Sequence, residues 1–269
     1  MKNDAEDKVR SFYQDKGWEQ EGDITEDARR WEDLRDNAQQ YVSDCRLRLL
    51  RYIPDHGQNM LDMASGPIQY PEYLEYSRNF SRRGRVDLSE KALSDAREKI
   101  GDHGEFLAGS FFDMDLPEDF FDCTISLHTI YHMDKDKQEA AVRKLVRLTK
   151  PEHPVIIVYS NPDSFIRFFP WKIMKSIKHR LNQSEKQSKK SPLYFYDHPV
   201  SWWYRFNDIA KVEIRPWRSF KSKDQKKIFP DNRFGGFLFK VLFFLEEKFP
   251  GFFARHGQYP MIILTRNPL

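Results

Sequence analysis

Residues 59–73 read NMLDMASGPIQYPEY, and this stretch decides the fold. The apolar residues that lead to Asp62 are typical of a buried strand, and the Ala-Ser-Gly-Pro that follows predicts a tight turn into a helix. The chain has only 12 glycines in 269 residues, so Gly66 indicates a backbone that must pass close to another group. Pro67 stiffens the start of the next helix. We therefore expect a binding site at the end of this strand.

Strand-like and helical runs alternate along the rest of the chain. Residues 25–53 carry apolar side chains at helical spacing with Thr25 as a cap, which predicts one helix, and a second helix is expected over residues 71–80. The later strands and helices are predicted, in order, in GRVDL, SEKALSDAREKI, EFLAGS, FDCTISL, KDKQEAAVRKLVRLT, PVIIVYS, PVSWWYRFN, AKVEIRPW, residues 234–249 and QYPMIILTRN. Such alternation predicts a parallel sheet with helices on both faces, closed by a last antiparallel strand.

The composition favours a folded globular protein in the cytoplasm. Charged residues make up 32% of the chain and hydrophobic residues 39%. Cys45 and Cys123 can form no disulfide framework and belong to no Cys/His cluster of metal-ligand spacing, so no metal is expected. The N-terminus has no secretory signal. The longest apolar segment, residues 234–245, is too short to span a membrane and contains Lys240, so we expect no transmembrane segment.

The net charge of +3 hides a local asymmetry. Residues 1–40 hold twelve acidic and seven basic side chains, whereas residues 172–190 hold seven Lys or Arg and one Glu. The basic stretch is typical of a solvated insertion, and it would also suit an anionic substrate, a membrane surface or nucleic acid. No aromatic residue interrupts it to stack on a base, so nucleic acid is not expected as a partner.

Polar residues follow the first two predicted strands where a ligand binds in parallel sheets. Asp62 ends the first strand, and Asp87 ends the second, where a carboxylate can accept hydrogen bonds from both hydroxyls of a ribose. The turn between them is not GxGxxG, because Ala64 and Ile68 replace the first and third glycines, and no GKS or GKT follows. A dinucleotide or a nucleoside triphosphate is therefore disfavoured.

These residues resemble the class I S-adenosylmethionine-dependent methyltransferases. LDMASGP is similar to the family's D-x-G-x-G loop, and VDLSEKAL to its acidic ribose-binding strand end. LAGSFFDMDLPEDFFDCTIS resembles its third and fourth strands, and SLHTIYHM its active-site strand end. The resemblance covers roughly residues 59–160, and four motifs in register make it specific.

The resemblance implies an α/β fold with a Rossmann-like, doubly wound, mostly parallel seven-stranded sheet. It divides the chain into an N-terminal helical cap over 1–55, a cofactor-binding core over 56–160, a basic and aromatic insertion over 161–200, and a completion of the sheet over 201–269 with a helical insertion at 219–255. It implies S-adenosyl-L-methionine as the cofactor and S-adenosyl-L-homocysteine as its product. The cofactor-binding residues that it implies are Asp62, Ala64, Ser65, Gly66, Pro67, Asp87, Leu88, Ser110, Phe111 and Leu127.

The end of the fourth strand carries the candidate catalytic residues. His128, Tyr131 and His132 can accept a proton near neutral pH or hydrogen-bond a methyl acceptor, and a helical turn would bring His128 onto one face with the other two. The resemblance places them near the transferred methyl group. His128 is the first candidate base, followed by His132 and Tyr131, and capping or packing under the cofactor is the alternative for each histidine.

The expected acceptor is a small molecule methylated on an oxygen or, second, on a nitrogen or carbon. The chain lacks the Asn/Asp-Pro-Pro-aromatic motif of base-methylating amino methyltransferases and a Cys-Pro pair for pyrimidine carbon. Aromatic residues in the predicted cap suit an aromatic acceptor, and Arg167, Lys172 and Lys175 would suit an anionic one. The alternatives are a nucleic-acid- or membrane-associated protein directed by the lysine-rich insertion, and a catalytically silent cofactor-binding protein.

Overall fold

The computed structural model describes residues 4–21, 24–165 and 193–268. The basic stretch at 172–190 and the aromatic residues Phe168, Phe169 and Trp171 lie outside these described residues. Within the described ranges, no helix combines the length and the apolar character that crossing a bilayer requires.

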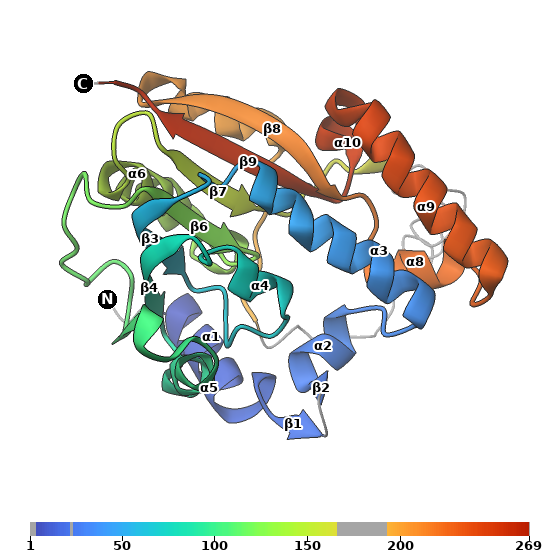
Figure 1. Ribbon diagram of the computed structural model, residues 1–269, viewed down its shortest axis with the longest axis horizontal. Coiled ribbons are helices and arrows are strands. Elements are labelled where there is room, and N and C mark those ends of the chain that lie inside the picture. The colour runs from blue at the N-terminus through green and yellow to red at the C-terminus, as the bar shows by residue number, and fades with distance from the viewer. Residues whose placement is uncertain (1–3, 22–23, 166–192, 269) are drawn as a thin grey trace, which may run out of the picture.

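A seven-stranded sheet forms the centre of the molecule (Figure 1). Its strands are β3 (Gly57–Met63), β4 (Phe80–Asp87), β5 (Gly104–Ala108), β6 (Cys123–Leu127), β7 (Pro154–Val158), β8 (Ala210–Arg218) and β9 (Tyr259–Arg266). Their spatial order is β5-β4-β3-β6-β7-β9-β8. Strand β9 runs in the direction opposite to the other six strands of this sheet. The predicted mostly parallel, Rossmann-like sheet with a final antiparallel strand is thus confirmed. The strand order reverses beside β3, which opens a crevice at the carboxyl ends of β3 and β6.

Successive side chains of the strands build two cores, one on each face of the sheet. Met60, Ile125 and Ile156 are buried on the face that packs against α3 (Asp36–Leu47) and α9 (Arg233–Lys248). Leu61 and Val155 are buried on the face covered by α6 (Gln138–Leu148). The helices that follow individual strands are α4 (Glu72–Glu75), α5 (Glu90–Ile100) and α6 (Gln138–Leu148), with short 3-10 turns at Gly101–His103, Ile130–His132, Lys135–Lys137 and Val200–Asp208.

Two predicted helices differ in extent from the observed ones. The helix expected over 71–80 ends early, because Phe80 already pairs with Gly57 in the sheet. The single helix expected over 25–53 is broken into α2 (Glu26–Trp31) and α3 (Asp36–Leu47), with a 3-10 turn at Arg48–Arg51. The break comes where the carboxylate of Asp33 binds the guanidinium of Arg35, at 2.6 and 2.9 Å, and the chain becomes extended. Thr25 caps α2 as predicted, since its Oγ1 accepts from the Ala28 N–H at 3.2 Å.

The N-terminal segment lies below the carboxyl ends of β3 and β4 in Figure 1. It starts with α1 (Asp4–Phe12) and a π-helical turn (Tyr13–Gly17), and a two-stranded hairpin of β1 (Gln20–Glu21) and β2 (Ile24–Thr25) connects this turn to α2. Three helices, α8 (Ser222–Ile228), α9 (Arg233–Lys248) and α10 (Pro250–His256), connect β8 to β9. The division of the chain into four segments stays a proposal.

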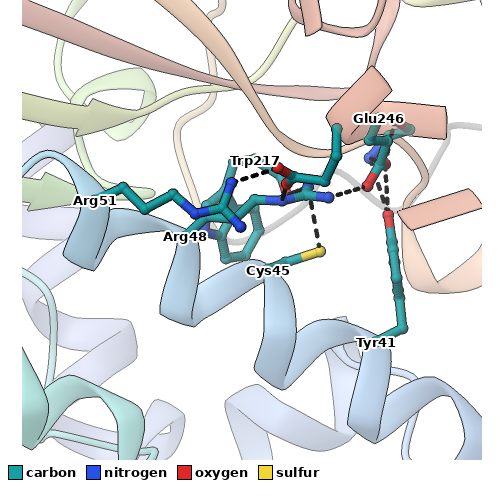
Figure 2. Close-up of polar contacts among 8 residues, drawn as sticks. Tyr41, Cys45, Arg48, Arg51, Trp217 and Glu246 are labelled. Atoms are coloured by element: carbon teal, nitrogen blue, oxygen red, sulfur yellow. Dashed lines mark hydrogen bonds and ion pairs between the residues drawn. The ribbon is translucent and has the colours of Figure 1, made fainter. Parts of the chain in front are cut away.

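A buried polar cluster ties α3 to α9 (Figure 2). The guanidinium of Arg48 donates to the carboxylate of Glu246 and to the Trp217 carbonyl, each at 2.7 Å, and the Tyr41 hydroxyl donates to Glu246 at 2.7 Å. Burial raises the pKa of the neighbouring Cys45 thiol to about 12, so this thiol stays protonated and unreactive.

Candidate active site

A cavity of about 470 Å³ opens at the carboxyl ends of β3, β4 and β6. Its floor consists of residues that directly follow these strands and β5, namely Met63, Ala64, Ser65, Gly66, Asp87, Leu88, Gly109, Phe111, Leu127 and His128. Its cover comes from the N-terminal segment, through Glu6, Tyr13, Trp18, Asp27, Trp31 and Glu32 among others. The sheet and a segment far away in sequence therefore enclose one space.

The loop after β3 holds an unusual backbone against this cavity. Ala64 and Gly66 have φ angles of 57° and 75°, in the left-handed region that favours glycine. The Ala64 N–H donates to the Val86 carbonyl at 2.8 Å, and the Ser65 hydroxyl accepts from the Leu127 N–H at 3.2 Å. A Cβ atom on Gly66 would lie 2.7 Å from the indole of Trp18. Only glycine therefore allows this close approach.

Asp62 lies behind this loop and does not line the cavity. Its carboxylate is fully buried and pairs with Arg83 at 2.5 Å and Arg85 at 3.0 Å, while Arg85 also donates to the Gly66 carbonyl. Burial alone would raise the pKa of Asp62, but the guanidinium groups of Arg85 and Arg83 outweigh burial and lower it. Asp62 thus positions the loop through Arg85, whereas we expected it to contact the ligand directly.

Asp87 faces the cavity from the end of β4. One of its carboxylate oxygens accepts from the Ser89 N–H at 2.9 Å, and Ser89 in turn caps α5. Burial raises the pKa of Asp87 to about 6. A buried carboxylate is stabilised by any hydroxyl that enters the cavity and donates to it, so this side chain is ready to bind a diol.

The loop after β5 meets the N-terminal segment. Gly109 and Phe111 line the cavity, but the Ser110 hydroxyl points to α1 and donates to the Glu6 carboxylate at 2.9 Å. Glu6 itself lines the cavity. Pro67 also lies outside the lining, and its carbonyl accepts from Lys99 at 3.1 Å. Of the ten cofactor-binding residues expected, Asp62, Pro67 and Ser110 do not face the cavity.

The three candidate catalytic residues lie together. His128, with φ of 60°, places its Nδ1 3.0 Å from the Tyr131 hydroxyl, and the 3-10 turn brings His132 beside them. The Nδ1 atom of His132 lies 2.7 Å from the Tyr194 carbonyl. A carbonyl only accepts, so Nδ1 carries the proton of the neutral ring and Nε2 keeps its lone pair.

Burial changes the acidity of this group. It lowers the pKa of His132 to about 4 and that of His128 well below its usual value, so both rings are neutral at pH 7. Burial raises the pKa of Tyr131, which keeps its hydroxyl protonated. The cluster therefore provides uncharged hydrogen-bond donors and acceptors.

The cover adds a carboxylate that the sequence did not single out. Asp27 lines the cavity and its Oδ1 accepts a long hydrogen bond of 3.4 Å from Tyr13, whose ring stacks on Trp18. Asp27 forms no ion pair with any residue that the structure describes. Burial and the nearby Glu32 raise its pKa to about 7. The acidic surplus of residues 1–40 was the only signal for it.

Glu32 and Arg218 form a second charged feature of the wall. Their side chains pair at 2.7 Å, and Arg46 lies 3.8 Å from the same Glu32 carboxylate. This pair is satisfied within the protein, in contrast to Asp27. Asp27 is thus the carboxylate of the cover with unused hydrogen-bonding capacity.

The comparisons with known proteins agree with this geometry. Residues 61–157 match the sequence model of a family described as a methyltransferase domain. No curated protein matches the chain. The fold resembles that of magnesium protoporphyrin IX methyltransferase (ChlM) from Synechocystis PCC 6803 with bound SAH, at 14% identity and a TM-score of 0.55, covering 98% of this chain and 100% of that one.

Two further solved structures resemble the chain over its whole length. N-methyltransferase NodS from Bradyrhizobium japonicum WM9 in complex with S-adenosyl-l-homocysteine has 12% identity and a TM-score of 0.54, covering 99% of this chain and 100% of that one. Phosphoethanolamine N-methyltransferase 1 from Haemonchus contortus has 10% identity and a TM-score of 0.61, covering 99% of this chain and 49% of that one.

Residues 61–157 are therefore a methyltransferase domain, and the chain has the fold of the S-adenosylmethionine-dependent methyltransferases that it resembles. Two of these solved structures contain S-adenosylhomocysteine, the product that S-adenosylmethionine leaves after methyl transfer. The residues on the cavity floor fit this group. Asp87 offers a buried carboxylate that a ribose can satisfy, and Gly66 lines the cavity with backbone alone.

Proposed function

We propose that this enzyme transfers a methyl group to an oxygen atom of a small-molecule acceptor by in-line displacement. S-Adenosylmethionine supplies an electrophilic methyl group on a sulfonium centre. The observation that carries the proposal is the carboxylate of Asp27, which has no ion pair within the described part of the chain and shares the cavity with the His128–Tyr131–His132 cluster. A hydroxyl acceptor must lose its proton, and this chamber contains a group that can take it.

The cofactor is held, in this proposal, by the floor of the cavity. Asp87 accepts from the ribose hydroxyls, Leu88 packs on the adenine, and the backbone of Ala64, Ser65 and Gly66 holds the methionine end. Leu127 and Phe111 complete the apolar wall. Asp62 and Pro67 act indirectly, because they position the loop that makes these contacts.

The loop after β5 carries no acidic residue at Gly109, Ser110 or Phe111, and Glu6 from α1 supplies a carboxylate beside it. Ser110 was expected to bind the cofactor there, but it donates its hydroxyl to Glu6, which reaches the cavity beside Gly109 and Phe111. We infer that the Glu6 carboxylate accepts from the adenine amine and that Ser110 positions Glu6. The N-terminal segment then contributes to cofactor binding as well as to the cover.

The roles of Asp27 and the histidines follow from their pKa values. A base works best when its pKa lies near the working pH, and burial brings the pKa of Asp27 to about 7 but lowers that of His132 to about 4. We therefore assign proton removal to Asp27. His128, Tyr131 and the free Nε2 of His132 orient the acceptor through hydrogen bonds.

A nitrogen acceptor is the second candidate, and the surroundings of Asp27 favour it. Tyr13 and Trp18 line the cavity beside Asp27, and aromatic faces beside a carboxylate stabilise an ammonium group. An acceptor directed by the lysine-rich insertion stays a hypothesis, because residues 172–190 lie outside the described part of the chain. A cytoplasmic location also stays a proposal.

The proposal is tested with the purified enzyme, S-adenosylmethionine, and a panel of phenols, hydroxy acids and primary amines, with products identified by mass spectrometry. We expect turnover of a hydroxyl compound, with kcat/KM that rises with pH through about 7 as Asp27 ionises. Asp27→Asn should lower kcat about 100-fold and remove this rise, while affinity for S-adenosylhomocysteine stays within about twofold. Turnover of amines alone would move the assignment to nitrogen.

The matched comparison is His132→Gln, which keeps a hydrogen-bonding group but no imidazole. Since burial holds the pKa of His132 near 4, its loss should raise KM for the acceptor and leave the rise through pH 7 in place. A profile that loses its rise in His132→Gln and keeps it in Asp27→Asn would reverse the two roles.

A further inference from the structure

The outer surface of α9 and α10 carries an unusual set of exposed phenylalanines. The five most exposed large apolar side chains among the described residues all lie there, at 54–62% exposure. They are Phe234, Phe237, Phe244, Phe249 and Phe252. Monomeric proteins rarely expose large apolar side chains together, so such clustering marks a surface that contacts something apolar.

The positions of these residues place them on one side of α9. Phe234, Phe237 and Phe244 are separated by three and seven residues, which repeats the helical period. The opposite side of the helix, with Phe239 and Leu242, is buried against α3, where Phe239 stacks on Tyr41. Helix α9 thus has one apolar face in the core and a second apolar face outside.

Basic side chains are interleaved with the exposed phenylalanines. Arg233, Lys240, Lys248 and Arg255 are all exposed, and none of them forms an ion pair within the described ranges of the chain. Figure 1 shows α9 and α10 at the edge of the molecule, with the sheet on their inner side. These four charges therefore face solvent without an internal counter-ion.

The acidic residues of α9 are turned away from this surface. Glu246 is fully buried and pairs with Arg48 at 2.7 Å, as Figure 2 shows, and Glu247 pairs with Arg48 at 2.8 Å and with Arg51. Helix α10 contains no acidic residue. The outward face of both helices is consequently aromatic and cationic, and the partly exposed carboxylate beside it, Glu247, is neutralised by Arg48 and Arg51.

We propose that the outer face of α9 and α10 binds the surface of a membrane that contains anionic lipids. Phenylalanines can enter the boundary between headgroups and acyl chains, while lysine and arginine stems extend along the apolar region and keep their charges among the lipid phosphates. A protein partner fits less well, since lysine is depleted at the centres of protein interfaces. This binding is peripheral and independent of the identity of the methyl acceptor.

The experiment is co-sedimentation of the full-length protein with vesicles of phosphatidylcholine alone and of phosphatidylcholine mixed with phosphatidylserine. We expect binding to the mixed vesicles that weakens as salt is raised. The triple variant Phe234→Ser/Phe237→Ser/Phe244→Ser should lower the partition coefficient by about tenfold or more, because it removes three apolar contacts with the bilayer. Exposed side chains tolerate such changes, and an unchanged Tm shift with S-adenosylhomocysteine reports intact folding.

Two further variants sharpen the result. Arg233→Gln/Lys240→Gln/Lys248→Gln should weaken binding to mixed vesicles and flatten its salt dependence. The matched control Phe120→Ser/Tyr204→Ser removes exposed aromatic side chains elsewhere and should bind as the wild type does.

Several outcomes would overturn the proposal. These are the absence of binding to mixed vesicles, binding that the triple phenylalanine variant leaves unchanged, and a dimer in sedimentation velocity that this variant dissolves without any vesicle binding. The last outcome would make a second copy of the chain the occupant of this face.

Discussion

At the scale of single residues, the loop after β3 explains why the chain places a rare glycine at position 66. Its φ of 75° requires freedom that other residues lack, and the Trp18 indole leaves no room for a side chain. Ala64 shares the left-handed conformation without being a glycine, and its N–H and carbonyl are both bonded, to Val86 and Thr129. These bonds hold the strained turn in place.

Gly66→Ala should therefore lower the free energy of unfolding by about 1–3 kcal/mol and weaken S-adenosylhomocysteine binding, because it adds strain and displaces Trp18. Urea unfolding and calorimetric titration measure the two effects. Gly101→Ala is the matched control, since Gly101 has φ of 62° and open space around it, so only the strain remains. Equal loss of ligand affinity in both variants would show that the Trp18 contact is unimportant.

The same scale shows what a sequence can predict about a site. Asp87, Gly66 and the His128–Tyr131–His132 group were found because each directly follows a strand, and strand ends are visible in the sequence. Glu6 in α1 and Asp27 in α2 were missed, because only tertiary packing brings them to the cavity. In the sequence, their carboxylates cannot be distinguished from those on the solvent-exposed side of any helix. Only the position of the N-terminal segment over the sheet shows that they reach the cavity.

At the scale of elements, the 3-10 turn that follows α3 is joined to α9 by an almost fully buried charge pair. The Arg48 and Glu246 side chains are 3% and 0% exposed. Removing one partner of such a pair leaves the other charge buried and uncompensated, which costs more than the pair itself contributes. This cost also explains why α9 turns Glu246 inward.

Arg48→Met should lower the free energy of unfolding by about 3–5 kcal/mol, because the carboxylate of Glu246 loses its counter-ion. Arg51→Met is the comparison, since Arg51 is 55% exposed and, among the residues that the structure describes, pairs with Glu247 alone, so its loss should cost about 1 kcal/mol or less. Chemical denaturation of both variants checks the difference. Similar losses in the two variants would mean that burial of the pair does not matter.

Helix boundaries were the least predictable elements, and each error has a local cause. The periodicity of residues 25–53 continues across the break between α2 and α3, because Asp33 and Arg35 interrupt only the backbone and not the apolar pattern. By contrast, the sequence predicted a helix cap at Thr25 and a helix start at Ser89. A capping hydroxyl binds the N–H three residues later, so the signal is local.

At the scale of the whole molecule, the sheet and an N-terminal cap were expected from the sequence, but the contacts between the cap and the strand ends were not. Alternating strands and helices, together with a resemblance carried by four motifs, predicted a mostly parallel seven-stranded sheet with a last antiparallel strand, whereas the order β5-β4-β3-β6-β7-β9-β8 comes from the structure. The cavity also depends on α1 and α2, which lie over the carboxyl ends of the strands. Their placement depends on contacts such as Ser110 with Glu6 that no local pattern predicts.

The central claim, a cofactor held by Asp87 at the carboxyl ends of the strands, is tested most directly by calorimetric titration with S-adenosylhomocysteine. We expect the wild type to bind one equivalent, and Asp87→Asn to bind about 10- to 100-fold more weakly through loss of charge-assisted hydrogen bonds. Asp102→Asn, a change at an exposed carboxylate, should bind as the wild type does. Absence of binding by the wild type, or equal affinity in Asp87→Asn, would contradict the claim.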